Sequence, residues 1–247
     1  MDKNDHDDPR VVLVSGGSRG IGAAITTALT QRGCRVACTY RAGRDKAEKL
    51  AVDAPEQVFP IHFDLHDDAT APVAVQRVIS HWGRLDSLIL NAGQWSGGRL
   101  AETDPTIWWR VIETNLRGTV ALARAALPHL QHGKSPSIVL VSSVVGVIGH
   151  AGDTAYASAK SAMIGFGRSL AKEVARDGIR VNVLAPGFVT TDMTDAVSES
   201  ARRRIERETV LGRFGTAGEI AKAAVFLSED ATFCTGSVLT VDGGWAL

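Results

Sequence analysis

The chain is poor in cysteine and has no excess of charge of either sign. Three cysteines among 247 residues, at positions 34, 38 and 234, are too few and too unevenly spaced for a disulfide framework or a zinc site. The 27 lysines and arginines balance 27 aspartates and glutamates, so no overall field draws the protein to nucleic acid or to an anionic membrane. We expect no bound metal and interpret the cysteines as small buried hydrophobic residues.

Long hydrophobic segments are also missing. No apolar run approaches the roughly eighteen residues that span a bilayer, and the acidic first residues lack the hydrophobic region of a signal peptide. With 45% hydrophobic residues, however, the chain can bury a large core. We expect a disordered acidic tail at residues 1–9 and one domain at residues 10–247, in a cytoplasmic protein.

Short β-branched runs alternate with longer amphipathic stretches along this domain. The predicted strands are residues 11–14, 35–40, 58–62, 87–90, 137–142, 180–184 and 237–241. The predicted helices lie between them, at about residues 20–32, 44–52, 68–81, 103–130, 155–176 and 217–228. Near-continuous apolar strands in such alternation indicate a parallel sheet covered by helices on both faces. The fold class is therefore α/β, a single doubly wound Rossmann-type domain with a seven-stranded parallel sheet.

One segment, residues 188–215, departs from this rhythm. It has no predicted strand and carries a charged helical pattern at about residues 194–208. Because it follows the sixth strand, it would lie at the carboxyl ends of the strands, where open α/β sheets bind ligands. We predict that it is a lid over that site. Its four arginines between positions 202 and 207 would either meet an acidic partner or form a solvated helix face paired with neighbouring glutamates.

A glycine-rich turn joins the first strand to the first helix. Its sequence, Ser15-Gly16-Gly17-Ser18-Arg19-Gly20-Ile21-Gly22, stands in the strand–turn–helix context of a dinucleotide-binding fingerprint. Gly16 permits the tight turn, Gly20 lets the backbone approach a pyrophosphate at the helix amino terminus, and Gly22 lets the helix pack on the sheet. The spacing is G-x3-G-x-G, and the alternative interpretation is a structural turn with no ligand.

The residues after the second strand favour NADP over NAD. An acidic residue there would hold a free ribose 2′-hydroxyl, but the strand ends in Tyr40 and Arg41 with no carboxylate before Asp45. Arg19, inside the glycine turn, offers a second guanidinium, and such groups suit a 2′-phosphate. The alternative is two solvated surface arginines. Asp64, after the third strand, would reach the adenine amino group or else cap the following helix.

Tyr156 and Lys160 form the most informative pair in the chain. Four residues apart, they share one face of a helix, so the ammonium lies beside the phenol. A neighbouring cation lowers the pKa of a phenol from about 10, which makes Tyr156 a candidate proton donor and acceptor. Ser143 follows the fifth strand, thirteen residues before the tyrosine. Asn115 falls inside a helical pattern, where an amide is a poor choice, and the residues alone leave it open as a buried structural amide.

In combination these motifs resemble the short-chain dehydrogenase/reductase family over essentially the whole chain. Asn91-Ala92-Gly93 after the fourth strand and Pro186-Gly187 after the sixth complete them in family order and spacing. Within the family, residues 142–146 and 185–194 look most like the 3-oxoacyl-(acyl-carrier-protein) reductases. The resemblance implies NADPH-dependent reduction of a 3-oxoacyl thioester, carried by an acyl carrier protein or coenzyme A. It also implies a homotetramer, with the helices at 103–130 and 155–176 packing between subunits.

The resemblance further implies a role for each site residue. Tyr156 would protonate the carbonyl oxygen, Lys160 would lower its pKa and hold the nicotinamide ribose, and Ser143 would donate a hydrogen bond to the substrate oxygen. Asn115 would hold a water that relays protons to the lysine, and Thr191 would hold the nicotinamide carboxamide. The cofactor-binding residues implied in this way are Gly16, Ser18, Arg19, Gly20, Ile21, Gly22, Arg41, Asp64, Leu65, Asn91, Ala92, Gly93, Tyr156, Lys160, Pro186, Gly187, Val189 and Thr191.

Two departures from the acyl-carrier-protein reductases leave the substrate open. The loop after Gly93 reads Gln94-Trp95-Ser96-Gly97-Gly98 instead of an Ile-Thr-Arg-Asp-like run, and Asp177 replaces a docking arginine before the sixth strand. His150, between Ser143 and Tyr156, is interpreted as pocket wall. One rival hypothesis is a reductase or dehydrogenase of another carbonyl, such as a polyketide, a cyclic ketone or a sugar. The other is a non-catalytic NADP-binding regulator, which the intact catalytic residues disfavour.

Overall fold

A seven-stranded sheet forms the centre of the computed structural model, which describes residues 8–195 and 197–247. The strand order is β3-β2-β1-β4-β5-β6-β9, and every pair of neighbours is parallel. These strands are β1 Val11–Val14, β2 Arg35–Tyr40, β3 Val58–His62, β4 Ser87–Leu90, β5 Ser137–Val141, β6 Arg180–Pro186 and β9 Val238–Val241. The predicted doubly wound α/β class is confirmed. The expected tail falls largely on residues 1–7, outside the described residues.

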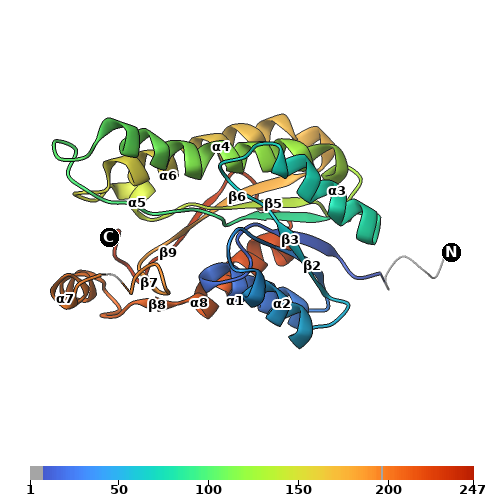
Figure 1. The fold of residues 1–247 in the computed structure, drawn as a ribbon, viewed down its shortest axis with the longest axis horizontal. Coiled ribbons are helices and arrows are strands. Elements are labelled where there is room, and N and C mark those ends of the chain that lie inside the picture. Colours follow the sequence, from blue (N-terminus) through green and yellow to red (C-terminus); the bar gives the residue numbers. More distant parts are fainter. Residues whose placement is uncertain (1–7, 196) are drawn as a thin grey trace.

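Helices cover both faces of this sheet. In Figure 1, α1, α2 and α8 lie on one side, and α3, α4 and α6 lie on the other. Their bounds are α1 Gly20–Gln31, α2 Arg44–Asp53, α3 Thr70–Trp82, α4 Pro105–Leu130, α6 Thr154–Glu173 and α8 Ala217–Val225, with a π-helical turn, Phe226–Asp230, after α8. Within the described part of the chain, no helix is long and apolar enough to cross a membrane.

The two faces of the sheet supply two separate hydrophobic cores, and β1 shows why. Side chains of a strand alternate between faces, so Val11 and Leu13 join the core under α3, α4 and α6, whereas Val12 and Val14 join the core under α1 and α8. All four are fully buried. Burial of each such side chain contributes about 1.5–3 kcal/mol, which explains why a four-residue strand is continuously apolar.

The segment after β6 differs from the prediction. Residues 188–215, expected to have no strand, contain β7 Val189–Thr190, which pairs in parallel with β8 Gly215–Thr216. This pair closes the base of the segment. The charged helix α7 spans Glu199–Glu208, and its N-cap Ser198 accepts a hydrogen bond from the backbone of Ala201. A short helix, α5 Val145–Ile148, was also not predicted.

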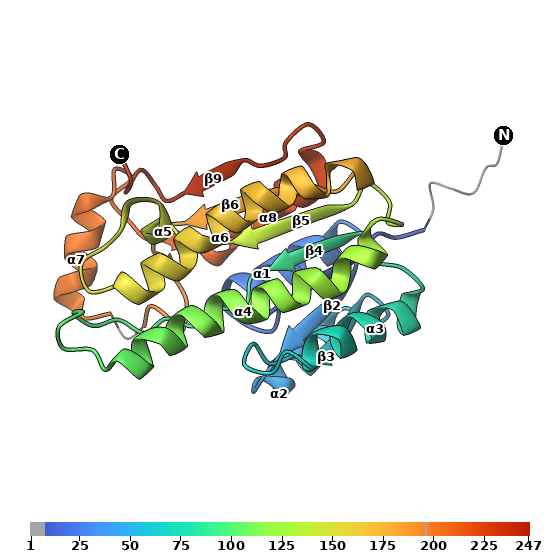
Figure 2. The same cartoon turned by 90° about the horizontal axis from the view of Figure 1, so that it is seen from above.

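The carboxyl ends of the strands gather at one edge of the molecule. Figure 2 shows the arrowheads of β4, β5 and β6 pointing toward the same end, where α5 and α7 lie. Strand order reverses between β1 and β4, and the glycine-rich turn follows β1 at that point. Ligands of doubly wound sheets bind in the crevice at such a reversal.

Candidate active site

The glycine-rich turn is held against the end of β4. Asn91 donates through Nδ2 to the carbonyl oxygens of Ser15 and Gly16, at 3.1 and 3.2 Å. Ser15 Oγ in return accepts from the backbone nitrogens of Asn91 and Ala92, both at 3.0 Å. The backbone nitrogen of Gly16 donates to Oγ1 of Thr39 on β2, at 2.9 Å. These bonds fix the turn between three strands at the reversal of strand order.

Two glycines of the turn leave no room for a side chain. A Cβ on Gly22 would lie 2.0 Å from the carbonyl oxygen of Gly16 and 2.6 Å from Nδ2 of Asn91. Gly16 has a φ of +62°, and its Cβ would lie 3.0 Å from the Cα of Ala92. Gly22 therefore brings the first turn of α1 directly onto the residues that follow β1 and β4.

The amino end of α1 is suited to an anion. Among the described residues no side chain caps this helix, and its first turn contains no acidic residue. Backbone N–H groups at such an end, together with the helix dipole, favour a phosphate. Thr191, at the start of the lid, lies over the turn, because its Cγ2 is the nearest atom, at 3.5 Å, to a Cβ built on Gly20. The turn and helix therefore fit the pyrophosphate of a dinucleotide.

The arginines expected at the adenosine end lie on the surface beside the turn. Arg19 and Arg41 are both exposed, and Nη1 of Arg41 lies 3.4 Å from Nδ1 of His66. Ser18 lies against the start of α2, because a Cβ on Gly43 would stand 3.4 Å from its Oγ. The turn that carries Arg19 is thus in contact with the segment that follows Arg41.

Asp64 does not cap the helix that follows it, so that alternative is wrong. Its Oδ1 accepts from the backbone nitrogen and from Nδ1 of His66, at 3.0 and 2.9 Å. Burial acts to raise the pKa of Asp64, but the hydrogen bonds from His66 and the nearby charges outweigh it and hold the pKa below its ordinary value. Leu65 lies under α4, where a Cβ on Gly118 would meet its carbonyl oxygen at 2.6 Å.

The last expected cofactor residues surround the carboxyl ends of β6 and β9. Pro186 ends β6, and its carbonyl oxygen accepts from the backbone nitrogen of Val144 at 2.8 Å. A Cβ on Gly187 would lie 2.7 Å from the Cα of Asp242, so glycine is needed where the residues that follow β6 and β9 approach each other. Val189 is buried in β7, and Ile21 packs against the core under α1 and α8.

Lys160 lies deep in the site, 2% exposed, on the second turn of α6. Its Nζ donates to the carbonyl oxygen of Val141 at 3.0 Å and lies 5.5 Å from the centre of the Tyr156 ring. Burial lowers the pKa of Lys160 to about 8. The i, i+4 spacing therefore places the two side chains on one face, as predicted.

The pKa of Tyr156 is raised, not lowered as the sequence analysis expected. Burial of the phenol is the larger cause, and the negative charge of Asp153 adds to it. The ammonium of Lys160 does not reverse this, because it is directed to the carbonyl of Val141. At neutral pH the phenol therefore keeps its proton, which is the form that a proton donor requires.

Ser143 lies two residues beyond Val141, the last residue of β5. Its Oγ accepts from the backbone nitrogen of Val145 at 3.2 Å, which leaves its hydroxyl hydrogen available to another acceptor. Ser142 ties the strand to α6 by donating to the carbonyl oxygen of Lys160 at 2.7 Å. A Cβ on Gly146 would lie 2.7 Å from the carbonyl carbon of Lys160, so glycine lets α5 rest directly on α6.

Asn115 is fully buried in α4 and binds backbone groups. Its Nδ2 donates to the carbonyl oxygens of Gln94 and Val111, at 2.7 and 2.9 Å, and its Oδ1 accepts from the backbone nitrogen of Gln94 at 3.1 Å. A Cβ on Gly93 would lie 2.7 Å from Asn115 Oδ1 and 3.3 Å from Lys160 Nζ. The amide thus has a structural role, and the proton relay implied by the resemblance stays a prediction.

A hydrogen-bonded group that was not predicted from the sequence lies beside Tyr156. Asp153, nine-tenths buried, accepts from Nε1 of Trp95 at 2.7 Å and lies 2.8 Å from Nδ1 of His150. The ring of His150 contacts Phe188 and Trp245, with centroids 6.2 and 5.7 Å away. The role of His150 as a pocket wall stays a prediction. The signal missed was an aspartate three residues before the tyrosine.

The lid contacts the cofactor side of the site and the end of the chain. Asp192 forms an exposed ion pair with Lys46 of α2, at 3.2 Å. Phe188 packs against Phe214 and Trp245, with centroids 5.6 and 5.1 Å apart. Among the described residues, no group of three or more histidines, cysteines or acidic residues is placed to hold a metal.

Most lid arginines have partners on their own helix. On α7, Arg202 pairs with Glu206, Arg203 with Glu199 and Arg204 with Glu208, at 3.2, 3.2 and 3.9 Å. Arg202 also stacks on the Phe214 ring, 4.3 Å from its centroid. This arrangement supports the alternative of a solvated helix face over a surface reserved for an acidic partner.

Comparison with known proteins agrees with this geometry. A family model described as enoyl-(acyl carrier protein) reductase matches residues 16–246. The chain is 38% identical over 239 residues to the 3-oxoacyl-(acyl-carrier-protein) reductase FabG of Salmonella typhimurium, covering 95% of this chain and 96% of that protein. The corresponding protein of Staphylococcus aureus is 36% identical over 236 residues, covering 94% and 96%.

Solved structures agree as well. A double mutant of the Serratia marcescens short-chain dehydrogenase/reductase superposes with a TM-score of 0.89 at 33% identity, covering 96% of this chain and 98% of that one. The fold and site define a nicotinamide-dependent oxidoreductase. The chain belongs to the short-chain dehydrogenase/reductase family, as the sequence resemblance indicated.

Proposed function

We propose that this enzyme reduces a 3-oxoacyl thioester, bound to an acyl carrier protein or to coenzyme A, to the 3-hydroxyacyl thioester with NADPH. The observation that supports the proposal is the position of Lys160 Nζ, 5.5 Å from the centre of the Tyr156 ring, on a helix that Ser142, the neighbour of Ser143, ties to β5. The names of the FabG relatives, at 36–38% identity, support the acyl substrate.

Each catalytic side chain has a chemical task in this proposal. NADPH, when bound, supplies the hydride. Tyr156, whose raised pKa keeps it protonated, donates its proton to the carbonyl oxygen of the substrate. Ser143 donates a hydrogen bond to the same oxygen and stabilises the charge that develops on it. Lys160 holds the nicotinamide ribose and its positive charge favours the loss of the proton from the phenol.

The preference for NADPH would come from Arg41 and Arg19. Arg41→Ala is expected to weaken NADPH binding by about 1.5–3 kcal/mol, because a charge-assisted hydrogen bond to the 2′-phosphate is lost, and to leave NADH nearly unchanged. Fluorescence titration of both cofactors measures this. Equal losses for NADPH and NADH would show that Arg41 does not recognise the 2′-phosphate.

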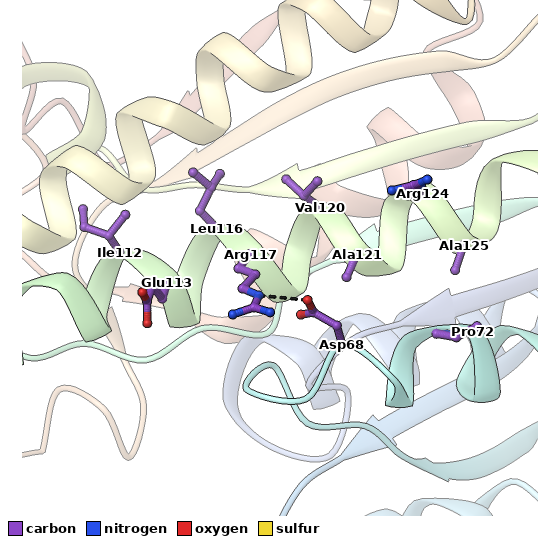
Figure 3. Close-up of a pocket in the computed structure, with 10 residues that line it drawn as sticks. All are labelled: Asp68, Pro72, Ile112, Glu113, Leu116, Arg117, Val120, Ala121, Arg124 and Ala125. Atoms are coloured by element: carbon purple, nitrogen blue, oxygen red, sulfur yellow. Dashed lines mark hydrogen bonds and ion pairs between the residues drawn. The ribbon is translucent and has the colours of Figure 1, made fainter.

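A homotetramer would bury an apolar groove on the outer face of α4. The groove has a volume of about 710 Å³. Figure 3 shows most of its residues along α4, with Arg117 bound to Asp68, which precedes α3, and with Pro72 on α3. Partly exposed apolar side chains, among them Ile112, Leu116 and Val120, alternate there with charged ones. Sedimentation of the full chain tests the assembly.

A second candidate is the reduction of another carbonyl, and one observation favours it. Trp95, Asp153 and His150 form a hydrogen-bonded wall beside Tyr156, in the region where the chain departs from the acyl-carrier-protein reductases. NADPH oxidation should be measured with a panel of 3-oxoacyl thioesters and of free cyclic, sugar and polyketide-like ketones. Higher kcat/KM for the thioesters supports the first proposal, and higher values for free ketones support the second.

A further inference from the structure

The loop at residues 94–98 is anchored at both ends along the start of α6. Before the loop, a Cβ on Gly93 would lie 3.3 Å from Nζ of Lys160, on the second turn of this helix. At the end of the loop, the backbone nitrogen of Gly98 donates to the carbonyl oxygen of Gly152, two residues before the helix begins, at 2.7 Å. The loop therefore runs beside the part of α6 that carries the proposed catalytic acid.

Between these anchors, Trp95 binds Asp153. Its indole Nε1 donates to Oδ1 of the carboxyl group at 2.7 Å, and because an indole N–H can only donate, Asp153 is the acceptor. Asp153 is 8% exposed, whereas Trp95 is 44% exposed. The bond thus fixes the polar edge of the indole and leaves part of its apolar ring open to a bound molecule.

Asp153 does not have the role that its position predicts. It is the N-cap residue of α6, where an aspartate ordinarily accepts a hydrogen bond from a backbone N–H of the first turn. Within residues 8–195 and 197–247 its carboxyl group accepts no such bond, and its Oδ2 lies 2.8 Å from Nδ1 of His150. The carboxyl group therefore holds the loop, not the helix.

Gly97 makes the contact between the indole and the carboxyl group possible. A Cβ at this position would lie 2.6 Å from Cζ2 of Trp95 and 3.0 Å from Oδ1 of Asp153. Glycine therefore lets the loop fold back on its own indole. The space enclosed by the loop and the starts of α4 and α6 has a volume of about 10 Å³, which is room for one water molecule at most. The loop is thus packed closely on both helices.

We propose that Asp153 is a positioning residue that holds the indole of Trp95 as a fixed wall beside Tyr156, and that this wall limits the size of the group next to the carbonyl that is reduced. The inference rests on the proposed role of Tyr156 as the acid, and it applies to a thioester and to a free ketone alike. After burial, the charge of Asp153 is the second cause of the raised pKa of Tyr156. The carboxyl group therefore lies near the reacting end of the substrate.

The loop can yield when this bond is lost. Four of its five residues are exposed, Gly97 and Gly98 among them, and exposed segments with few buried contacts open at a low cost in free energy. A large substituent on the carbonyl would then displace the indole, whereas a small one would gain nothing. Loss of the bond should therefore change the selectivity between substrates more than the turnover of the smaller one.

The test uses two variants that break the bond and two that keep it. Asp153→Ala removes the acceptor, and Gly97→Ala moves the indole away from it. Asp153→Asn removes the charge but keeps a side-chain oxygen that accepts from the indole. Trp108→Phe is the matched control, because it removes a bond of the same kind, from Nε1 of Trp108 to Oγ1 of Thr154 at 3.0 Å, at the same end of α6.

The substrates are matched pairs that carry either a methyl or a phenyl group on the reacting carbonyl. One pair consists of coenzyme A thioesters and the other of free ketones, and NADPH oxidation gives kcat/KM for each. The readout is kcat/KM of the phenyl substrate divided by that of the methyl substrate. Any effect of the lost charge on the acidity of Tyr156 is common to both members of a pair, so it cancels in this quotient.

Asp153→Ala and Gly97→Ala should each raise the quotient by about threefold to tenfold, the effect expected for the loss of one hydrogen bond. Asp153→Asn and Trp108→Phe should leave it unchanged. The proposal is overturned if Asp153→Ala and Gly97→Ala do not change the quotient. It is also overturned if Asp153→Asn or Trp108→Phe raises the quotient as much as they do. Thermal unfolding shows which variants are folded, and Gly97→Ala decides the test if Asp153→Ala does not fold.

A second measurement does not depend on turnover. The amide hydrogen of Gly98, which is bound to Gly152, should exchange with solvent about threefold to tenfold faster in Asp153→Ala or Gly97→Ala than in the wild type and in Asp153→Asn. If the substrates are reduced but this exchange is the same in all four proteins, only the role of Asp153 is wrong. If neither pair of substrates is reduced by the wild type, the proposed function is wrong, and the substrate wall with it.

Discussion

The cofactor side and the lid side of the active site are built in different ways. On the cofactor side, backbone atoms approach one another so closely that Gly16 and Gly22 have no space for a side chain. On the lid side, α7 is a surface helix whose charges pair along its own length, and Ile205 is its one buried residue within the described chain.

Because of this difference, the two sides should tolerate amino-acid substitutions to different degrees. Close backbone contacts cannot relax when a methyl group is added, because the interior is packed at crystal density. Exposed ion pairs are worth about 0–1 kcal/mol each, and their partners are readily exchanged. Changes on the cofactor side should therefore affect folding and binding strongly, whereas changes on α7 should affect only the encounter with a charged partner.

The largest expected effect lies between the two sides, at Tyr156. Tyr156→Phe removes only the hydroxyl, so turnover should decrease by about 10²- to 10⁴-fold, the usual contribution of a positioned acid, while NADPH binding stays intact. Steady-state kinetics and cofactor titration measure the two quantities. Lys160→Ala should reduce both, because that ammonium is proposed to hold the ribose. Substantial activity in the phenylalanine variant would move the acid to another group, with His150 the first to examine.

The next effect tests the backbone contacts of the cofactor side. Gly22→Ala places a methyl group 2.0 Å from the carbonyl oxygen of Gly16, and overpacking of this kind costs about 1–3 kcal/mol of unfolding free energy or more. Gly218→Ala on α8 is the matched control, since its Cβ would have no neighbour closer than 4.0 Å. That variant should gain up to about 1 kcal/mol, because alanine is the better helix former. Similar losses in denaturant unfolding of both variants would refute the steric argument.

A smaller effect follows from the pKa of Lys160. Burial lowers that pKa to about 8, so the ammonium is present below pH 8 and is lost as the pH rises through it. For the free enzyme, kcat/KM for reduction should decrease above about pH 8, by roughly tenfold per pH unit. In the Lys160→Arg variant the guanidinium stays charged over the whole pH range. The decrease in the activity that this variant retains should therefore occur at higher pH. If the pH profile of kcat/KM is the same in Lys160→Arg as in the wild type, a group other than Lys160 causes the decrease above about pH 8.

The same shift has a consequence for stability. An unfolded chain binds the lysine proton up to about pH 10.4, but the folded chain releases it near pH 8. Between these values the unfolded state holds more protons, so the contribution of Lys160 to the unfolding free energy increases with pH.

The smallest effect is expected on the lid. Replacing Arg203 and Arg207 by glutamate should raise KM for a carrier-bound substrate a few-fold at low salt and leave a short thioester unaffected, because these charges lie on the surface. Screening over about 8 Å at physiological ionic strength should shrink the difference. If carrier-bound and free thioesters respond alike, α7 does not dock the carrier.

Most of the fold could be predicted from the sequence, because the pattern of apolar residues is clear in strands and helices that are buried along their whole length. Four strands were predicted with their observed bounds, β1 to β4. The pair β7–β8 was missed, since two-residue strands have no periodicity to detect. The short helix α5 was missed for the same reason, with four residues and no amphipathic repeat.

The site was predicted in part. The spacing of Tyr156 and Lys160 correctly predicted that they share a helix face, because this depends only on helix geometry. The direction of the pKa shift of Tyr156 was wrong, since it depends on burial and on Asp153, and neither is visible in a spacing. The bonds of Asn115 to Gln94, and of His66 to Asp64, likewise depend on how separate loops meet.

The aromatic contacts of Trp245 make displacement of the lid observable by the fluorescence of this tryptophan. This indole lies 5.1 Å from the ring of Phe188, at the base of the lid, and 5.7 Å from His150, in the wall beside Tyr156. The lid is also tied to this end of the chain by the bond from the backbone of Leu211 to Gly243, at 3.0 Å. Any displacement of the lid changes the polarity around the indole. The protein thus carries its own optical probe of lid position, and Trp245→Phe identifies its signal among the five tryptophans.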